Sequence, residues 1–197
     1  MTFYDFAKVT VRTSALVLWR VRVYGAQYVP ATGPLLVACN HVSYLDPPLL
    51  GSFCPRRISY MAKKELFVIP VLGGVIRALG AYAVDREGSA TAAIKRSLRV
   101  LQEGGVVGIF PEGRRNRAGD ASAQTGVALL AALAQVPVVP AFIRGTDRAL
   151  RLARISVAFG EPLAPPARKA TRDDLAKFTS EIMRSIEMLA GSNGGNS

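Results

Sequence analysis

Short runs of aliphatic and β-branched residues recur along the chain between more polar segments. Each run is a few residues long and is typical of a β-strand whose side chains are buried in a sheet. The predicted strands are Arg20 to Tyr24, Leu35 to Cys39, Ile58 to Met61, Ala81 to Val84, Val106 to Phe110, Pro137 to Ile143 and Ile155 to Phe159.

The segments between several of these strands have the apolar spacing of helices. Residues 89–103 carry one apolar stripe and are followed by Gly104, a residue type that commonly ends a helix. Residues 124–135 are rich in alanine and leucine. Thr171 and Asp174 form a capping box ahead of apolar residues at helical spacing, which predicts a final amphipathic helix.

The alternation of strands and helices predicts an α/β fold, in which a mixed, mostly parallel sheet is covered by helices on both faces. Ligands of such sheets bind at the loops beyond the strand ends. The chain has 197 residues, half of them hydrophobic, with no internal repeat and no interior linker, so a single domain is expected over residues 20–190. Residues 191–197 are rich in Gly, Asn and Ser and are expected to be a disordered tail.

Residues 1–19 are predicted to form an N-terminal amphipathic helix. The most apolar run, Ala15 to Trp19, is far shorter than the ~18 residues that a membrane-spanning helix needs. At about 100° per residue, an apolar side and a charged side oppose each other. The apolar side holds Phe3, Phe6, Val17 and Leu18, and the charged side holds Asp5, Lys8 and Arg12. The apolar side either lies in a membrane interface or packs on the domain.

The chain is strongly basic, with 25 lysine and arginine residues against 14 aspartate and glutamate residues and a formal net charge of +11. This charge favours nucleic acid, an anionic bilayer or an acidic protein as the partner, and the mean hydropathy of +0.23 favours the bilayer. The two cysteines, Cys39 and Cys54, lack the CxxC spacing of a zinc or redox site and are too few for a disulfide scaffold. A reduced, cytoplasmic compartment is therefore expected.

The chain has one histidine, so it lacks the paired histidines of HExxH metalloproteases. The GxxxxGK, GxGxxG and GxSxG motifs are absent from the sequence as well. His41 follows a predicted strand, and Asp46 comes five residues later, where it is expected to be the N-cap of a helix. A carboxylate at this spacing can fold back onto one ring nitrogen and leave the other to take a proton. The alternative is a structural histidine beside a capping aspartate.

A second group of polar residues follows the predicted strand Val106 to Phe110. Glu112 and Gly113 lead into several arginines; the glycine lets the backbone approach a ligand, and guanidinium groups suit a phosphate ester. Lys63 and Arg86 come just after other predicted strands. These cations are either a solvated surface or, together with the histidine, converge on an anionic substrate.

At these residues the sequence resembles the glycerolipid acyltransferases, and most closely their 1-acylglycerol-3-phosphate acyltransferase branch. The blocks that carry the resemblance are Asn40-His41 with Asp46, Met61 to Leu66 leading to Ile69-Pro70 and Gly73, Gly80 to Arg86, Phe110-Pro111-Glu112-Gly113, and Val136 to Pro140. They come in the family's order and cover roughly residues 20–160. HxxxxD followed at the right distance by FPEG is far more specific than either motif alone.

The resemblance implies that His41 and Asp46 are the catalytic pair. It implies that the glycerophosphate is bound by Lys63, Arg86, Glu112, Gly113 and Arg115. The implied reaction moves a fatty acyl group from acyl-CoA or acyl carrier protein to the sn-2 hydroxyl of lysophosphatidic acid, giving phosphatidic acid in phospholipid biosynthesis, with no cofactor and no metal. The expected place of action is the cytoplasmic face of the cell membrane. There the protein would be peripheral or monotopic on an anionic lipid surface, with no nucleic-acid partner.

Three positions depart from the family's usual pattern. Arg114 stands where the family usually has threonine, Asn116 where it has serine, and Gln124 where a lysine is common. These departures leave the acyl-transfer pair intact but concern the acceptor head group, so the alternative is an acyltransferase for another lysophospholipid or for glycerol 3-phosphate. A second alternative, to which the net charge of +11 would contribute, is a non-catalytic module that binds anionic lipid or nucleic acid. Beside the histidine, Cys39 is expected to pack in the core and Ser43 to shape the turn.

Overall fold

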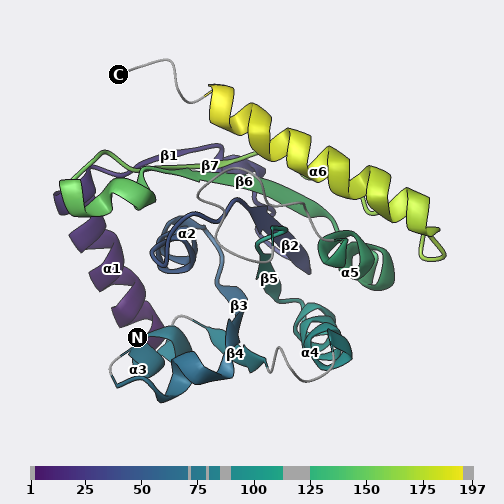
Figure 1. Cartoon of the computed structure of the whole chain (residues 1–197), viewed down its shortest axis with the longest axis horizontal. Helices are drawn as coiled ribbons and strands as arrows, with labels where there is room; N and C mark the ends of the chain where they lie inside the picture. Colours follow the sequence, from purple (N-terminus) through teal and green to yellow (C-terminus); the bar gives the residue numbers. More distant parts are fainter. Residues whose placement is uncertain (1–2, 71, 79, 85–89, 113–124, 193–197) are drawn as a thin grey trace.

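The computed structural model describes residues 3–70, 72–78, 80–84, 90–112 and 125–192 of the chain. These residues form one sheet of seven strands in the order β1-β7-β6-β2-β5-β3-β4 (Figure 1). Neighbouring strands are parallel except β6 and β7, which pair antiparallel. The strands are β1 (Arg22–Tyr24), β2 (Leu35–Cys39), β3 (Ile58–Lys63), β4 (Ala81–Val84), β5 (Val106–Ile109), β6 (Val138–Arg144) and β7 (Ser156–Phe159).

Helices cover both faces of this sheet. The α-helices are α1 (Phe3–Trp19), α2 (Asp46–Phe53), α3 (Leu72–Ala78), α4 (Ala90–Gln102), α5 (Gly126–Ala134) and α6 (Arg172–Ser192). Short 3-10 helices are η1 (Ala26–Tyr28), η2 (Lys64–Val68) and η3 (Thr146–Arg151). Helices α1 and α2 lie on one side of the sheet, and α4, α5 and α6 lie on the other (Figure 1).

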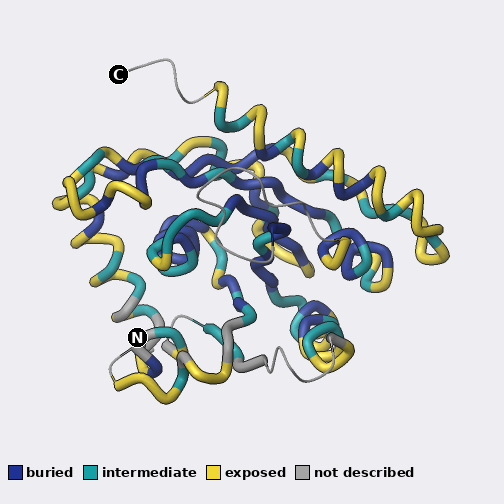
Figure 2. Tube along the Cα trace, viewed as in Figure 1, coloured by how far each residue is buried: buried dark blue, intermediate teal, exposed yellow. Residues whose placement is uncertain are grey.

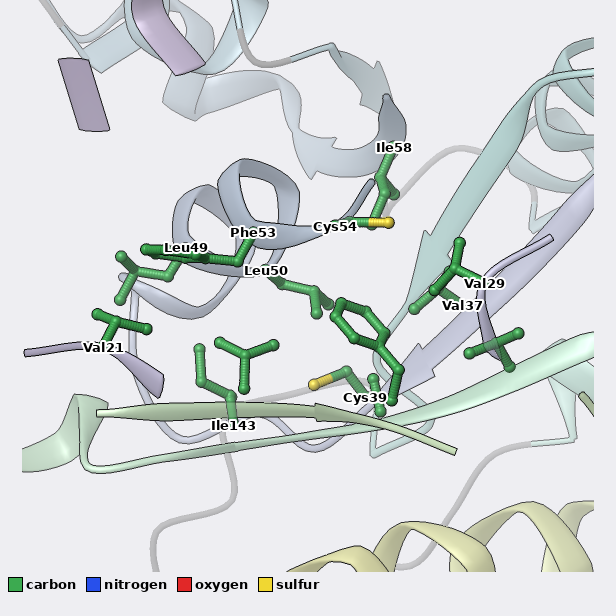
Figure 3. Packing of buried hydrophobic residues seen from close by; sticks show 14 of the residues in the cluster. Val21, Val29, Val37, Cys39, Leu49, Leu50, Phe53, Cys54, Ile58 and Ile143 are labelled. Carbon is green, nitrogen blue, oxygen red and sulfur yellow. The ribbon is translucent and has the colours of Figure 1, made fainter. Parts of the chain in front are cut away.

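Two apolar cores, one on each face of the sheet, hold these layers together. Leu35, Val37 and Cys39 of β2 point into the core shared with α2, while Leu36 and Ala38 point into the core shared with α5 and α6. Figure 2 shows the central strands buried along their length, and Figure 3 shows the side chains of α2 packed towards the sheet. Strands buried on both faces have continuous apolar sequences, which is why the hydrophobic pattern located them.

The structure confirms the predicted α/β fold with a mixed, mostly parallel sheet and an N-terminal helix. The capping box at α6 is confirmed as well, because Thr171 Oγ1 accepts the Asp174 N–H at 3.2 Å and Asp174 Oδ2 accepts the Thr171 N–H at 2.9 Å. Helix α6 continues to Ser192, so residues 191 and 192 of the expected tail are helical, and residues 193–197 lie outside the described part. Helix α3 and the 3-10 helices are too short to leave a clear periodicity in the sequence.

Helix α1 packs on the core that it shares with α2 through Val11, Ala15 and Trp19, and it turns several other apolar side chains outward. Lys8 Nζ donates to the Cys54 carbonyl at 2.8 Å, Arg12 lies over the Phe53 ring at 5.6 Å, and Ala15 is fully buried. Burial lowers the pKa of the Lys8 ammonium group. The exposed large apolar residues of α1 are Phe6, Val9, Leu16, Val17 and Leu18. The alternative in which the apolar side packs on the domain is therefore wrong for Phe6, Val17 and Leu18.

Within the described residues, no helix has the length and apolar character to cross a membrane.

Candidate active site

His41 and Asp46 meet at the carboxyl end of β2, in the loop that leads into α2. His41 Nδ1 lies 2.9 Å from Asp46 Oδ2. The same oxygen accepts the backbone N–H groups of Val42 and Ser43, each at 2.7 Å. Asp46 is fully buried, whereas 16% of the His41 side chain is exposed. The loop is thus folded around one carboxylate oxygen, with an imidazole that substrate can reach.

Asp46 is not the N-cap of α2, contrary to the expectation from the sequence. The helix begins at Asp46 itself, and Leu45 occupies the N-cap position without a side-chain bond. A capping carboxylate at Asp46 would accept the backbone N–H of the residue two or three positions later. Pro48 has no N–H, and the Leu49 N–H donates to the Leu45 carbonyl at 3.0 Å. The carboxylate therefore turns back and accepts the loop donors that precede the helix.

The hydrogen-bonding pattern assigns a role to each nitrogen of the His41 ring. A carboxylate accepts hydrogen bonds and has no hydrogen to donate, so the bond between Asp46 Oδ2 and the ring requires a hydrogen on Nδ1. Nε2 then carries the lone pair and can take a proton from a hydroxyl group. The neighbouring carboxylate stabilises the imidazolium that this transfer produces. The pair has the geometry of a general base and the group that orients it.

An aromatic stack fixes the plane of this imidazole. Phe110, the residue after β5, stacks on His41 with 4.2 Å between ring centroids and 25° between ring planes. Tyr60 of β3 stacks on Phe110 in turn, with 6.0 Å between centroids. Gly108 of β5 leaves the space that Tyr60 occupies, because a Cβ atom there would lie 2.3 Å from Tyr60 Cε1. Residues of two neighbouring strands, β3 and β5 with the residue after it, thus hold the histidine ring in one orientation.

Asn40 ties the end of β2 to its neighbour β6. Its Nδ2 donates to the Ile143 carbonyl at 3.0 Å, and its Oδ1 accepts the Ile143 N–H at 2.8 Å. The Cys39 thiol donates to the same Oδ1 at 3.4 Å. Burial raises the pKa of the Cys39 thiol well above its usual value, which keeps the thiol protonated and leaves it the expected packing role. The Asn40 bonds set the direction in which the chain leaves the sheet towards His41.

Glu112 is buried beside the histidine loop. Burial raises the pKa of its carboxyl group, an effect that a hydrogen bond from the backbone of His41 opposes. Glu112 Oε2 and Asp46 Oδ1 are both buried and have no hydrogen-bond partner within the described part of the chain. Because buried polar atoms are normally paired, an oxygen left open at this position suits a donor group supplied by a ligand or by water.

The structure brings together some of the expected site residues and leaves others undescribed. His41, Asp46 and Glu112 lie together, since Asp46 contacts the His41 ring and Glu112 accepts a hydrogen bond from the His41 backbone. Lys63 ends β3, a strand parallel to β2 and β5 in the same sheet, so its backbone reaches the same edge, but its side chain is not described. The other expected binding residues, Arg86, Gly113 and Arg115, lie outside the described residues.

The structure adds two residues to which the sequence assigned no role, Asn40 and Phe110. Both belong to the blocks that carry the family resemblance, and each is the first residue after a strand. A polar amide directly before a histidine and an aromatic residue at a neighbouring strand end are the available signals in the sequence. Neither signal predicts which residue the side chain contacts. Ile143, the partner of Asn40, lies 103 residues away along the chain.

Replacing Phe110 by leucine is expected to lower turnover about 10- to 100-fold with little change in KM, because the imidazole loses its stacking partner and its fixed orientation. Replacing Phe110 by tyrosine keeps the ring and should keep most of the activity. Steady-state kinetics of both variants, with thermal unfolding as a control, measure this effect. Equal losses in the leucine and tyrosine variants, or a change in KM alone, would contradict a positioning role.

Two sequence comparisons bear on the family. The family model described as Acyltransferase matches residues 20–144. A 1-acyl-sn-glycerol-3-phosphate acyltransferase of Bacillus subtilis is 34% identical over 175 residues, which are 86% of this chain and 87% of that protein. The protein of the same name from Borreliella burgdorferi is 36% identical over 105 residues, which are 51% of this chain and 41% of that protein.

A solved structure has the same fold. The crystal structure of the 1-acyl-sn-glycerophosphate (LPA) acyltransferase PlsC from Thermotoga maritima matches with a TM-score of 0.79 and 24% sequence identity. The match covers 98% of this chain and 81% of the other. The family model covers most of the sheet and the whole histidine loop, and the Bacillus relative matches along most of both chains. This chain therefore belongs to the acyltransferase family.

Proposed function

We propose that this chain transfers a fatty acyl group from acyl-CoA or acyl carrier protein to the sn-2 hydroxyl of lysophosphatidic acid, giving phosphatidic acid. The observation that carries the proposal is the His41–Asp46 pair at the end of β2, with Nε2 of the histidine available to accept a proton. The name of the Bacillus relative, which matches along 87% of its length, supports the acceptor. Membership of an enzyme family, together with an intact HxxxxD, favours catalysis over a module that only binds.

In this proposal His41 is the general base. The acceptor's hydroxyl oxygen attacks the thioester carbonyl carbon while His41 Nε2 takes the hydroxyl proton. The C–S bond of the tetrahedral intermediate then breaks, and the leaving thiolate takes the proton from the imidazolium as the new ester forms. General base catalysis of this kind contributes about 10²–10⁴-fold. Because a thioester is already activated, the reaction needs no acyl-enzyme and no cofactor.

The intermediate's oxyanion needs hydrogen-bond donors, and we assign this role to backbone N–H groups near Glu112 and Gly113. Glu112 lies in contact with the histidine loop and keeps one buried oxygen open. That oxygen can accept a hydrogen bond from an arginine of the glycerophosphate site or from the acceptor itself. The carboxylate would then link the binding of the head group to the position of the reacting hydroxyl.

The acceptor's phosphate is assigned to Lys63, Arg86 and Arg115. The formal net charge of +11 supports an anionic substrate, and guanidinium groups bind phosphate oxygens in pairs. Among these residues, only Lys63 has a described backbone. It ends β3, a strand that pairs with β5. The assignment therefore depends on the motif blocks in which the three residues stand.

Arg115→Ala and Arg86→Ala are each expected to lower kcat/KM for lysophosphatidic acid about 10- to 100-fold, because each removes a charge-assisted bond to phosphate. Use of a neutral monoacylglycerol should change little. Arg172→Ala, at the exposed start of α6, is the matched control and should leave both rates unchanged. Equal losses with the neutral and the phosphorylated acceptor would contradict the phosphate assignment.

The proposed place of action is the cytoplasmic face of the cell membrane, with the chain attached as a peripheral or monotopic protein. The outward apolar side of α1, including Phe6, Val17 and Leu18, supports this proposal. A helix that exposes several large apolar side chains on one side is unfavourable in water. Burial of those side chains in a lipid interface removes that cost.

Release of free thiol from acyl-CoA and from acylated carrier protein tests the proposed function directly. The acceptors are lysophosphatidic acid, other lysophospholipids and glycerol 3-phosphate. We expect the highest kcat/KM with lysophosphatidic acid. A higher value with another lysophospholipid or with glycerol 3-phosphate would change the assigned acceptor. No thiol release with any acceptor would favour the binding module.

A further inference from the structure

Helix η3 and the residue after it expose two leucines on a segment that Thr146 and Ala149 anchor in the domain. Leu150 is fully exposed and Leu152 is 62% exposed, whereas Ala149 is buried. The segment therefore has an inner side on the core and an outer side that carries leucine. Single exposed leucines are common on soluble proteins, so the surroundings of this pair decide what it means.

The fold holds these leucines outward. Trp19 Nε1 of α1 donates to the Ala149 carbonyl at 2.8 Å, and the Leu152 N–H donates to the same carbonyl at 3.0 Å. Gly145 begins the segment at φ 86°, where a Cβ atom would lie 2.3 Å from the Arg154 carbonyl oxygen. Leu152 has φ 51°, a left-handed conformation that glycine or asparagine adopts more easily. The backbone conformation does not favour leucine at this position, so the presence of an exposed leucine side chain needs another explanation.

Arginines surround the two leucines. Arg148, Arg151 and Arg154 are all exposed, and in residues 144–154 the acidic residue is Asp147, which pairs with Arg148 at 3.7 Å. The surface thus combines positive charge with protruding apolar side chains. A partner that fits it needs negative charge at its surface and an apolar layer beneath, which is the structure of an anionic phospholipid bilayer.

The same end of the molecule carries the exposed end of α1. Val17 and Leu18 are exposed and directly precede Trp19, whose indole N–H donates to the Ala149 carbonyl of η3. In Figure 2 the exposed residues of α1 and of the η3 region meet at this end. The leucines of η3 therefore extend an apolar surface that α1 already presents.

The position of η3 links this surface to the candidate active site. Strand β6 is parallel to its neighbour β2, so η3 after β6 and His41 after β2 leave the sheet at the same edge. Asn40 joins the two strand ends through both of its hydrogen bonds to Ile143. A contact made by η3 is thus fixed in direction relative to the histidine.

We propose that Leu150 and Leu152 insert into the interface of an anionic phospholipid bilayer while Arg148, Arg151 and Arg154 bind its head groups, as a second membrane contact beside α1. The proposal rests on the proposed function insofar as a lipid acceptor brings the enzyme to a membrane. Two separate contacts set the tilt of the domain on the bilayer, which a single amphipathic helix leaves free. The carboxyl edge of the sheet then faces the lipid that supplies the acceptor.

An acidic protein, such as an acyl carrier protein, is the main rival partner for this surface. Its negative charge would match the arginines equally well. The fully protruding Leu150 favours a fluid layer, because a folded protein would need a matching pocket, and the continuity with the apolar side of α1 favours the bilayer as well.

The test compares Leu150→Asp with Met188→Asp by co-sedimentation with phosphatidylglycerol–phosphatidylcholine vesicles and with pure phosphatidylcholine vesicles. Met188 is exposed on α6, on the other side of the sheet, and its substitution makes the same change in charge. We expect Leu150→Asp to weaken binding to the anionic vesicles about tenfold and Met188→Asp less than about twofold. Circular dichroism and thermal unfolding of both variants control for folding.

Equal binding of Leu150→Asp and Met188→Asp to the anionic vesicles would overturn the proposal. Unchanged vesicle binding with weaker use of acyl carrier protein as the donor would also overturn it and would assign the surface to a protein partner. The test is separate from that of the proposed function, because vesicle binding needs no turnover. Turnover of a short-chain, soluble lysophosphatidate tests the function without a membrane.

Discussion

His41→Ala is expected to lower the turnover of acyl transfer by at least about 10²-fold, because it removes the proposed base and leaves the binding surfaces in place. The chain has one histidine, so no second imidazole can replace it. The fold should persist, since His41 belongs to neither apolar core of the described residues. Steady-state kinetics with lysophosphatidic acid measure the loss, and vesicle binding should be unchanged.

Added imidazole gives a sharper version of this experiment. The alanine variant leaves a space bounded by the Phe110 ring and the Asp46 carboxylate, both of which contact the native imidazole. Free imidazole can bind there and recover part of the activity. If the folded variant kept more than about a tenth of the wild-type turnover without imidazole, the general-base role would be wrong.

Asp46→Asn is expected to lower turnover about 10- to 100-fold, less than His41→Ala does. The amide oxygen can take the place of Oδ2 and still accept the Val42 N–H, the Ser43 N–H and the ring hydrogen of His41. The loop and the ring tautomer are then kept, and the loss comes from the missing negative charge that stabilises the imidazolium.

The same substitution should also lower stability. The amide nitrogen would occupy the place of Asp46 Oδ1, which is buried and has no partner among the described residues. An unpaired buried N–H₂ group costs about 1–3 kcal/mol of unfolding free energy, which urea denaturation can measure. Asp174→Asn is the matched control, because Asp174 also accepts a backbone N–H near a helix start but lies far from His41 along the chain. Activity at wild-type level in Asp46→Asn would show that the carboxylate charge has no catalytic role.

The sequence by itself determined the elements whose signals are local. Strand β2 has its predicted bounds, Leu35–Cys39, because a strand buried on both faces needs a continuous apolar run. The capping box of Thr171 and Asp174 was predictable because both partners lie within one helical turn. The spacing of His41 and Asp46 indicated their contact for a similar reason, since five residues are enough to close a tight loop.

Only the tertiary structure decided the contacts that depend on how distant segments meet. The helical pattern of α1 distinguishes two sides, but which residues face the domain depends on the surface that they meet. Val11, Ala15 and Trp19 pack on the core, and Lys8 and Arg12 beside them meet the Cys54 carbonyl and the Phe53 ring. The other partners of the histidine loop follow from the strand order, which no local pattern specifies. This order places β5 and β6 on either side of β2. Phe110 therefore meets the imidazole, and Ile143 meets the amide that precedes it.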